Sequence, residues 1–338
     1  MAARIGWAVL GCGDITEKRG APALVDLPEA LLVGFHSRSA ERGREFAGRF
    51  GALRSTTSRD EILADPMVQA VYVATEHFRH LDDVLACAAA GKHVLCEKPI
   101  ANTAEDGARM VDACRANGVS LQVAYYRRYY PKLLKMKQLL DAGAIGEPVS
   151  ASIHLSSRLH PARLGPEEQH QRWHLSAELS GGGALVDTGS HRLDILCWLL
   201  GKPDRVAALV ECREWPIEAP DMEALLIRME RGVHVATRHG YRSGSPDELS
   251  VAGTEGTLDA TGVDGPDLRL HTGSGASART ETFHMPKHPN MHYPLFEDFN
   301  RAIMEGRPPT HTGEDGLQAS RIISAAYESA RTGRIVAV

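Results

Sequence analysis

An acid, a lysine and a proline follow a short, largely apolar run in the first third of the chain. The run is HVLC at residues 93–96, and Glu97, Lys98 and Pro99 come directly after it. Such a run predicts a buried strand, which the proline ends. A lysine at the carboxyl end of a parallel strand lies at the sheet edge where ligands bind, so its ammonium can stabilise negative charge on a substrate oxygen. A solvated lysine that only ends the strand is the alternative.

A second set of ionisable residues lies in the segment GGGALVDTGSHRLD, residues 181–194. If a helix begins after the three glycines, Asp187 and His191 share one face, with Asp194 one turn further on. Histidine titrates near neutral pH, so His191 can accept a hydroxyl proton or return it. Asp187 can then orient His191 or hold a substrate hydroxyl. By spacing alone, a solvated helix face with a satisfied pair is the favoured interpretation, and Asp194 can be purely structural.

Two glycines, Gly11 and Gly13, lie between the first apolar run, residues 5–10, and a polar helix start. Glycines in this place let backbone amides approach a pyrophosphate, which the helix N-terminus also attracts. The motif is incomplete, because Thr16 stands where a third glycine or alanine is usual. Its position between a strand and a helix nevertheless predicts a dinucleotide site.

The end of the next apolar run, residues 30–35, bears on the choice of coenzyme. An acid there would bind the ribose hydroxyls of NAD, but the sequence has Ser37 and Arg38 and no acid before Glu41. A guanidinium suits the 2′-phosphate of NADP. We therefore expect NADP to be favoured over NAD. A solvated Arg38 is the alternative interpretation.

The first third of the chain must supply the strand ends that these residues occupy. Short apolar runs alternate there with helical patterns, at residues 5–10, 30–35, 70–74, 93–96 and 119–124. This alternation predicts an α/β Rossmann domain over residues 1–124, with a parallel sheet covered by helices on both faces.

After about residue 125, strand-like runs follow one another with only short polar turns between them. They lie at residues 148–157, 205–212, 222–229, 233–242, 247–252 and 257–261, and helices are expected at 131–142, 293–305 and 314–331. We therefore expect residues 125–338 to form an α+β domain with a large, mainly antiparallel sheet, for substrate binding and oligomerisation. The bare face of that sheet is where a homo-oligomer would form.

Composition and charge exclude several classes of partner. The 338 residues carry a net charge of −5, with a pI near 6.3, so neither nucleic acid nor a membrane surface is an expected partner. The run YYRRYYP at 125–131 is too short to change this for nucleic acid. No apolar run reaches membrane-spanning length, and the six cysteines lack C-x-x-C spacing, which indicates a reduced, cytoplasmic protein.

Histidines recur every four residues at His284, His288 and His292. Pro286 and Pro289 break any helix there, and no acid or cysteine completes a tetrahedral ligand set, so we expect no metal. His292 is kept as a candidate substrate contact.

Six strings, in their order and spacing, resemble the glucose–fructose oxidoreductase / inositol dehydrogenase (Gfo/Idh/MocA) family over nearly the whole chain. The resemblance implies hydride transfer between a nicotinamide coenzyme and a hydroxyl or carbonyl group of a small carbohydrate-like molecule: a sugar, polyol or cyclitol. It favours a catalytic role for Lys98, Asp187 and His191. The strings are GCGDI (11–15), HVLCEKPIANT (93–103), VAYYRRYYP (123–131), GGGALVDTGSHRLD (181–194), GTEGTL (253–258) and GEDGLQASRIISAAYESARTGR (313–334).

Together, the residue patterns and the resemblance name two sets of candidate contacts. The coenzyme set is Gly11, Gly13, Asp14, Ile15, Ser37, Arg38, Thr75, His80, Glu97, Lys98 and Trp173. The substrate set is Tyr126, Arg128, Arg172, His174 and His292. The chain departs from the family in two places: T-P-N-x-x-H is here Thr75-Glu76-His77-Phe78-Arg79-His80, and W-R is Trp173-His174 with Arg172 in front.

Two other functions remain open on the sequence alone. One is a lyase or glycoside hydrolase whose tightly bound NAD is reduced and restored in each cycle, which would form product without a net change in nicotinamide absorbance. The other is a non-catalytic coenzyme-binding sensor, which would have no need of Lys98, Asp187 and His191.

Overall fold

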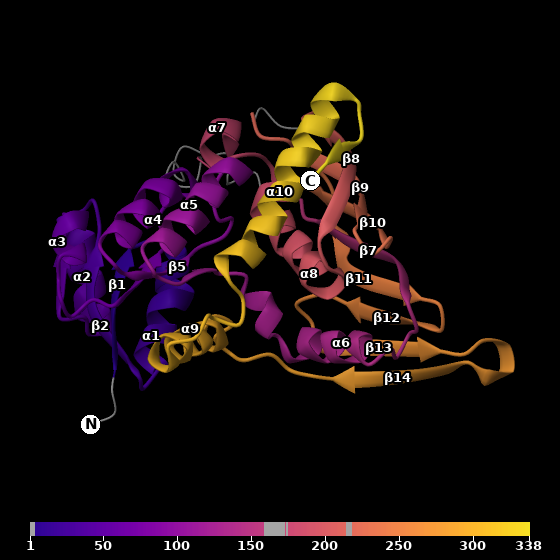
Figure 1. The fold of residues 1–338 in the computed structure, drawn as a ribbon, viewed down its shortest axis with the longest axis horizontal. Helices are drawn as coiled ribbons and strands as arrows, with labels where there is room; N and C mark the ends of the chain where they lie inside the picture. The colour runs from indigo at the N-terminus through magenta and orange to yellow at the C-terminus, as the bar shows by residue number, and fades with distance from the viewer. Residues whose placement is uncertain (1–3, 159–172, 174, 214–217) are drawn as a thin grey trace. The chain divides into compact units, whose positions relative to one another are not determined.

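The computed structural model of the chain describes residues 4–158, 173, 175–213 and 218–338. These form two compact units, each shown in Figure 1. The first contains residues 1–126 and 288–317, and the second contains residues 127–287 and 318–338. This division differs from the expected one, 1–124 and 125–338, because residues 288–317 group with the first unit.

The first unit is built on a six-stranded parallel sheet with strand order β3-β2-β1-β4-β5-β6. All six residues of β1 are buried, as expected for a strand covered on both faces. The strand order reverses at β1, which places a topological switch point between β1 and β4. The predicted Rossmann fold is confirmed. The strands are β1 (Ile5–Leu10), β2 (Ala30–His36), β3 (Arg54–Thr56), β4 (Ala70–Val73), β5 (His93–Cys96) and β6 (Leu121–Val123).

Side-chain caps fix where three helices of the first unit begin. The hydroxyls of Ser39, Ser58 and Thr103 each accept a hydrogen bond from the backbone N–H three residues further on, which satisfies a donor that the helix leaves open. The helical segments of this unit are η1 (Thr16–Gly20), α1 (Ala21–Asp26), α2 (Ala40–Phe50), α3 (Arg59–Leu63), η2 (His77–Arg79), α4 (His80–Ala89), α5 (Ala104–Ala116) and α9 (Tyr293–Glu305).

Helix α9 completes the core beside β1, although about 170 residues separate it from the rest of the unit in sequence. The indole of Trp7 lies 5.3 Å from the ring of Phe296 and 5.8 Å from that of Phe299, centroid to centroid. The indole N–H donates to Asn300 Oδ1 at 3.0 Å. This apolar packing explains why residues 288–317 join the first unit rather than the second.

The second unit contains a nine-stranded sheet with strand order β14-β13-β12-β11-β7-β10-β9-β8-β15. Every neighbouring pair is antiparallel except β7 and β10, which confirms the predicted mainly antiparallel sheet. The strands from β13 onwards were not predicted. The strands are β7 (Pro148–Ser156), β8 (Pro203–Glu211), β9 (Met222–Met229), β10 (His234–Gly240), β11 (Ser245–Gly253), β12 (Gly256–Thr261), β13 (Asp267–Thr272), β14 (Arg279–His284) and β15 (Val336–Ala337).

One face of this sheet is covered by helices and the other is bare (Figure 1). Strand β9 shows the alternation, because Leu225 and Ile227 are 2% exposed whereas Leu226 between them is 66% exposed. The helical segments of the second unit, with two that cross its boundary, are η3 (Tyr126–Tyr129), α6 (Pro131–Asp141), α7 (Ala177–Ser180), η6 (Leu185–Gly189), α8 (Ser190–Leu200), η7 (Gly275–Ser277) and α10 (Gly313–Thr332). Among the described helices, none has both the length and the apolar character needed to cross a bilayer.

Candidate active site

The glycine turn after β1 leaves room for a ligand. Gly11 has φ +106°, and a side chain there would bring its Cβ within 2.4 Å of the Ala74 carbonyl oxygen. A Cβ on Gly13 would meet no atom within 4 Å, so the protein's own packing does not require glycine there. The helix begins at Asp14 and Ile15, and the amides of its first turn have no partner within the helix. These residues fit the pyrophosphate of a dinucleotide.

Thr16 and Gly20 together take the place of the missing third glycine: Thr16 closes the turn and Gly20 lets the helix pack closely on the sheet. The Thr16 hydroxyl donates to the Gly11 carbonyl oxygen at 2.8 Å and closes the turn. The close contact between helix and sheet falls at Gly20, where a Cβ would lie 2.3 Å from the ring of Tyr72 in β4. The incomplete motif therefore supports the same packing with a glycine four residues later.

Ser37 and Arg38 follow β2, as predicted. The Ser37 side chain is buried and its hydroxyl accepts the Ser39 N–H at 3.2 Å. The Arg38 side chain is 71% exposed, and its Nη2 lies 2.5 Å from Oε1 of Glu76, in the segment after β4. The guanidinium is thus at the carboxyl edge of the sheet, but it is paired with a carboxylate that was not among the predicted coenzyme contacts.

Thr75 and His80 hold the backbone around Lys98. The Thr75 hydroxyl donates to Asp83 Oδ2 at 2.8 Å, and the two ring nitrogens of His80 lie 3.1 Å from the Thr75 carbonyl oxygen and 3.0 Å from that of Pro99. Burial lowers the pKa of His80, although its contacts with the two carbonyl groups act the other way. His80 is fully buried, so its side chain connects the segment after β4 to the cis Lys98–Pro99 bond.

A buried carboxylate lies next to Lys98. Glu97 is 5% exposed, and its Oε1 accepts hydrogen bonds from the Tyr72 hydroxyl at 2.5 Å and from His292 Nε2 at 3.1 Å. Its Oε2 accepts the backbone N–H of Lys98 at 3.2 Å. Burial alone would raise the pKa of Glu97, but the His292 and Tyr72 hydrogen bonds and the positive charges of His292 and Lys98 lower it below its ordinary value. Glu97 is therefore ionised at neutral pH.

His292, a predicted substrate contact, belongs to this cluster. Its ring is 1% exposed and lies 4.6 Å from that of Tyr126, centroid to centroid. Tyr72 and the segment carrying His292 were absent from the predicted coenzyme site. All four residues of β4 are buried, so its pattern does not single out Tyr72, and no local pattern places His292 beside Glu97.

The second unit carries Asp187 and His191 on one continuous helical stretch. Asp187 lies in the π-helical turn η6, and His191 in the first turn of α8 is 4% exposed. The hydroxyl of Tyr241, at the end of β10, donates to Asp187 Oδ2 at 3.1 Å. Tyr241 is buried and was not predicted, because no helical or strand periodicity relates residue 241 to residue 187.

Arg128 and Asp194 form a buried ion pair within the second unit. Arg128 Nε lies 2.9 Å from Asp194 Oδ2, and Nη2 lies 2.5 Å from Oδ1, with both side chains at most 4% exposed. This two-point geometry is that of a strong, specific pair. It joins the turn η3 to α8, which is the structural role that the sequence left open for Asp194.

A second buried carboxyl group supports the segment that leads to Asp187. Glu223 Oε1 accepts the N–H of Leu185 at 3.3 Å and lies 3.5 Å from the Tyr327 hydroxyl, which accepts the N–H of Gly183 at 3.1 Å. Its Oε2 has no hydrogen-bond partner among the described residues. Burial raises the pKa of Glu223 to about 8, so the group is largely protonated at neutral pH.

Trp173 is described and is partly exposed, whereas the candidate contacts Arg172 and His174 lie outside the described residues. Within the described part of the chain, no cluster of three or more His, Cys, Asp or Glu side chains is arranged to hold a metal ion.

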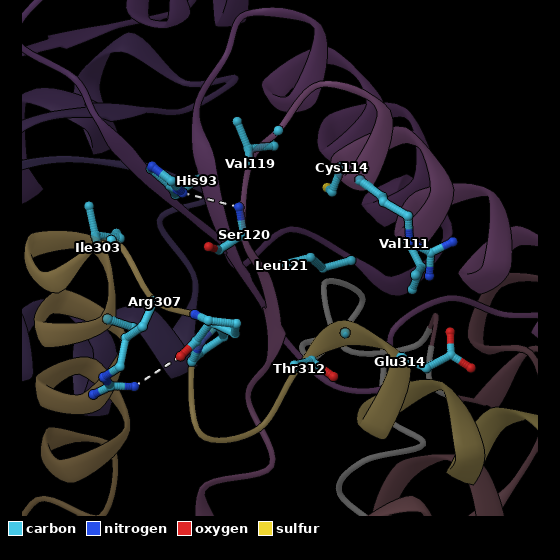
Figure 2. Close-up of a pocket in the computed structure, with 17 residues that line it drawn as sticks. His93, Val111, Cys114, Val119, Ser120, Leu121, Ile303, Arg307, Thr312 and Glu314 are labelled. Atoms are coloured by element: carbon cyan, nitrogen blue, oxygen red, sulfur yellow. Dashed lines mark hydrogen bonds between the residues drawn. The ribbon is translucent and has the colours of Figure 1, made fainter.

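A cavity of about 560 Å³ lies elsewhere in the first unit (Figure 2). Its lining includes His93 and Leu121, the first residues of β5 and β6, so it opens at the amino ends of the parallel strands. Its polar groups include a His93 Nδ1 that accepts the Ser120 N–H at 3.0 Å and an Arg307 paired with Asp298. Dinucleotides bind at the carboxyl ends of such strands, so this cavity is not the coenzyme site.

Comparison with known proteins gives matches along most of the chain. Residues 5–125 match the family model described as "Oxidoreductase family, NAD-binding Rossmann fold", and residues 133–259 match "GFO/IDH/MocA C-terminal domain". The chain is 31% identical to the 1,5-anhydro-D-fructose reductase of Ensifer adhaerens over 332 residues, which are 97% of each chain. It is 30% identical to the scyllo-inositol 2-dehydrogenase (NADP(+)) of Bacillus subtilis over 300 residues, 82% of this chain and 81% of the relative.

Among solved structures, the aldose–aldose oxidoreductase from Caulobacter crescentus complexed with glycerol matches with a TM-score of 0.87. The two sequences are 26% identical, and the match covers 99% of this chain and 100% of the other.

Proposed function

Because the chain belongs to the GFO/IDH/MocA family of NAD-binding oxidoreductases, we propose that it is an NADP-preferring dehydrogenase or reductase of a sugar, polyol or cyclitol. The family gives the general activity, which is NAD(P)-dependent oxidation of a hydroxyl group or reduction of a carbonyl group. The coenzyme preference, the substrate class and the roles of individual residues are the proposal.

The observation that carries the residue assignments is the buried, ionised Glu97, whose carboxylate accepts the backbone N–H of Lys98. Tyr72 and His292 hold this carboxylate, and the carboxylate holds the backbone N–H of Lys98, from which the Lys98 side chain extends. Lys98 donates a hydrogen bond to the reacting substrate oxygen and stabilises the negative charge that develops on it.

The nicotinamide coenzyme supplies the hydride acceptor or donor when it is bound. His191 takes the hydroxyl proton of the substrate during oxidation and returns a proton to the carbonyl oxygen during reduction. Asp187, whose Oδ2 accepts the Tyr241 hydroxyl, orients His191 or holds a neighbouring substrate hydroxyl. Charge is balanced, because the substrate carbon loses a hydride as its oxygen loses a proton.

Arg38 and the absence of an acid before Glu41 support the preference for NADP. One charged hydrogen bond contributes about 1.5–3 kcal/mol, which corresponds to roughly ten- to hundredfold in affinity. We therefore expect NADPH to bind more tightly than NADH by about that factor, and Arg38→Ala to remove most of the difference. Equal affinities in the unaltered protein would contradict this preference.

The substrate class is tested by a panel of sugars, cyclitols and uronates with both coenzymes, followed by nicotinamide absorbance. Two of the similar proteins, a 1,5-anhydro-D-fructose reductase and a scyllo-inositol 2-dehydrogenase, support carbohydrate-like substrates. A net absorbance change with at least one member is the expected result. Product without net change would instead support the transient redox cycle of a lyase or hydrolase, and coenzyme binding without any product would support a sensor.

The bare face of the second unit's sheet is the proposed contact between copies of the chain. A row of paired residues crosses five strands there, with Leu226 as its large apolar member beside Ala207, Ala236, Ser152 and Ser250. Small side chains let a second sheet approach closely, and a cavity of about 690 Å³ lies along this row.

We also place the enzyme in the cytoplasm, and its buried cysteine thiols, such as Cys87 and Cys96, suit a reducing compartment.

A further inference from the structure

We propose that Glu76 sets the coenzyme preference by competing with the 2′-phosphate of NADP for Arg38, and that it accepts a ribose hydroxyl when NAD is bound. Glu76 is thus a specificity-determining residue that opposes Arg38. The inference rests on the proposed dinucleotide role of the glycine turn and extends it to a residue at which the chain departs from the family pattern.

The two side chains come from opposite sides of the glycine turn. Arg38 lies two residues beyond β2, and Glu76 lies three residues beyond β4; these two strands flank β1 in the sheet. The N–H of Gly11 donates to the His36 carbonyl oxygen at 3.1 Å, so the turn touches the segment that leads to Arg38.

The same turn also touches the segment that leads to Glu76. A Cβ on Gly11 would lie 2.4 Å from the Ala74 carbonyl oxygen and 3.1 Å from the Thr75 nitrogen. The Arg38–Glu76 contact of 2.5 Å therefore joins the two segments that border the turn, at the edge where the adenosine end of a dinucleotide binds.

Charge makes this arrangement selective. A phosphate monoester carries about −1.5 to −2 charges at neutral pH. Its approach to Arg38 breaks the existing ion pair and brings two anions together at Glu76. A free 2′-hydroxyl carries no charge and can donate to the Glu76 carboxylate, which is the interaction that an acid provides in NAD-binding Rossmann domains. Removal of the Glu76 charge should therefore favour NADP and disfavour NAD.

Exposure limits the size of the effect. The Arg38 side chain is 71% exposed and that of Glu76 is 25% exposed, so solvent and salt screen the pair. We expect a change of about threefold to tenfold in affinity for each coenzyme, in opposite directions, and a smaller change at high ionic strength.

The test is a fluorescence titration of NADPH and NADH into the intact protein and three variants, at low and at high salt. Glu76→Gln should tighten NADPH binding and weaken NADH binding. Arg38→Ala should weaken NADPH binding alone. In the Arg38→Ala background, adding Glu76→Gln should tighten NADPH binding by a smaller factor than it does in the unaltered protein, because no guanidinium is left to compete for.

A matched control is Asp112→Asn, which removes a carboxylate from an exposed ion pair with Arg115 on α5. It should leave the ratio of the two affinities unchanged, and thermal melting should show that all variants remain folded. An unchanged ratio in Glu76→Gln, or equal shifts for both coenzymes, would overturn the inference. The NADP preference is judged separately, because it fails if Arg38→Ala does not change NADPH affinity.

Discussion

Glu97 and Lys98 are neighbours in the sequence, but the charge of Glu97 depends on side chains far away in the sequence. Tyr72 and His292 donate both hydrogen bonds that Glu97 Oε1 accepts, and they keep its pKa low despite burial. A buried carboxylate without such donors would be protonated and would give Lys98 no counter-charge. The spacing of E-K-P names the two ionisable groups, but only the fold supplies the donors.

Replacing Lys98 tests its role at the reacting oxygen. Lys98→Met should lower kcat by about 10²–10³, because a charged donor to the developing alkoxide is lost. Coenzyme affinity, measured by fluorescence titration, should change by a smaller factor than kcat. Lys202→Met, at an exposed lysine of the second unit, is the control and should keep normal turnover. Near-normal turnover in Lys98→Met would contradict the assignment.

Tyr241 tests whether Asp187 must be held in place. Tyr241→Phe removes the hydroxyl that donates to Asp187 Oδ2, and it should lower kcat by about tenfold, the value of one hydrogen bond to a charged group. His191→Ala should cost about 10²–10⁴-fold. The pH profile of kcat distinguishes the two variants. Tyr241→Phe should shift the pH at which kcat changes, whereas His191→Ala should remove this pH dependence. A Tyr241→Phe profile identical to that of the unaltered enzyme would assign the hydroxyl a structural role only.

At the scale of the element, the segment 181–189 is anchored by groups on a strand and on the last helix. Glu223 of β9 accepts a hydrogen bond from the N–H of Leu185, and Tyr327 of α10 accepts one from the N–H of Gly183. Both amides lie at or just before the start of the π-helical turn that carries Asp187. The three glycines predict a helix start, and this is correct. The sequence does not predict the contact of Glu223 with this segment, because a charged residue in a strand is normally expected to face solvent.

The anchor gives the protein a pH-dependent stability. The pKa of Glu223 rises from 4.5 to about 8 on burial, so between these pH values the folded protein binds more protons than the unfolded chain. The free energy of unfolding should therefore fall as the pH rises from 4.5 towards 8. Glu223→Gln stays neutral, and it should flatten this slope and raise stability at pH 8 by on the order of a few kcal/mol.

Urea unfolding at pH 5, 6.5 and 8 measures this slope. Glu248→Gln, at an exposed position of β11, is the matched control and should follow the unaltered protein. A Glu223→Gln variant whose stability has the same pH slope as the control would show that Glu223 is ionised in the folded state.

At the scale of the whole molecule, short-range patterns predicted five of the six parallel strands and their order of appearance, because each of the five is a compact apolar run; the edge strand β3, Arg-Ser-Thr, is polar and was not predicted. They did not predict that residues 288–317 complete the first unit. That outcome depends on Trp7 meeting Phe296 and Phe299 across nearly the full length of the chain. Strands β13 and β14 were missed for a related reason: every residue of β14 is at least partly exposed, so apolar alternation is weak there.

The bare sheet face is tested by changing its central apolar side chain. Leu226→Asp places a charge on the row that includes Ala207 and Ala236, and it should convert an oligomer into smaller species, as measured by light scattering after size exclusion. Leu226 is 66% exposed in the single chain, so the fold should tolerate the change. Leu53→Asp, at a 59% exposed leucine of the first unit, is the control. A Leu226→Asp variant with the same mass as the unaltered protein would rule out this contact.

The contact between Gly20 and Tyr72 affects how Rossmann domains can be recognised from a glycine pattern in their sequence. A glycine fingerprint marks the place where a helix comes close to a strand, and the π turn at residues 16–20 moves that place along the chain. A pattern search that demands a small residue at position 16 would discard this chain, whereas one that allows threonine there and glycine four residues later would retain it. Introducing glycine at position 16 by protein engineering would remove the hydroxyl that closes the turn without bringing the helix any nearer to the sheet.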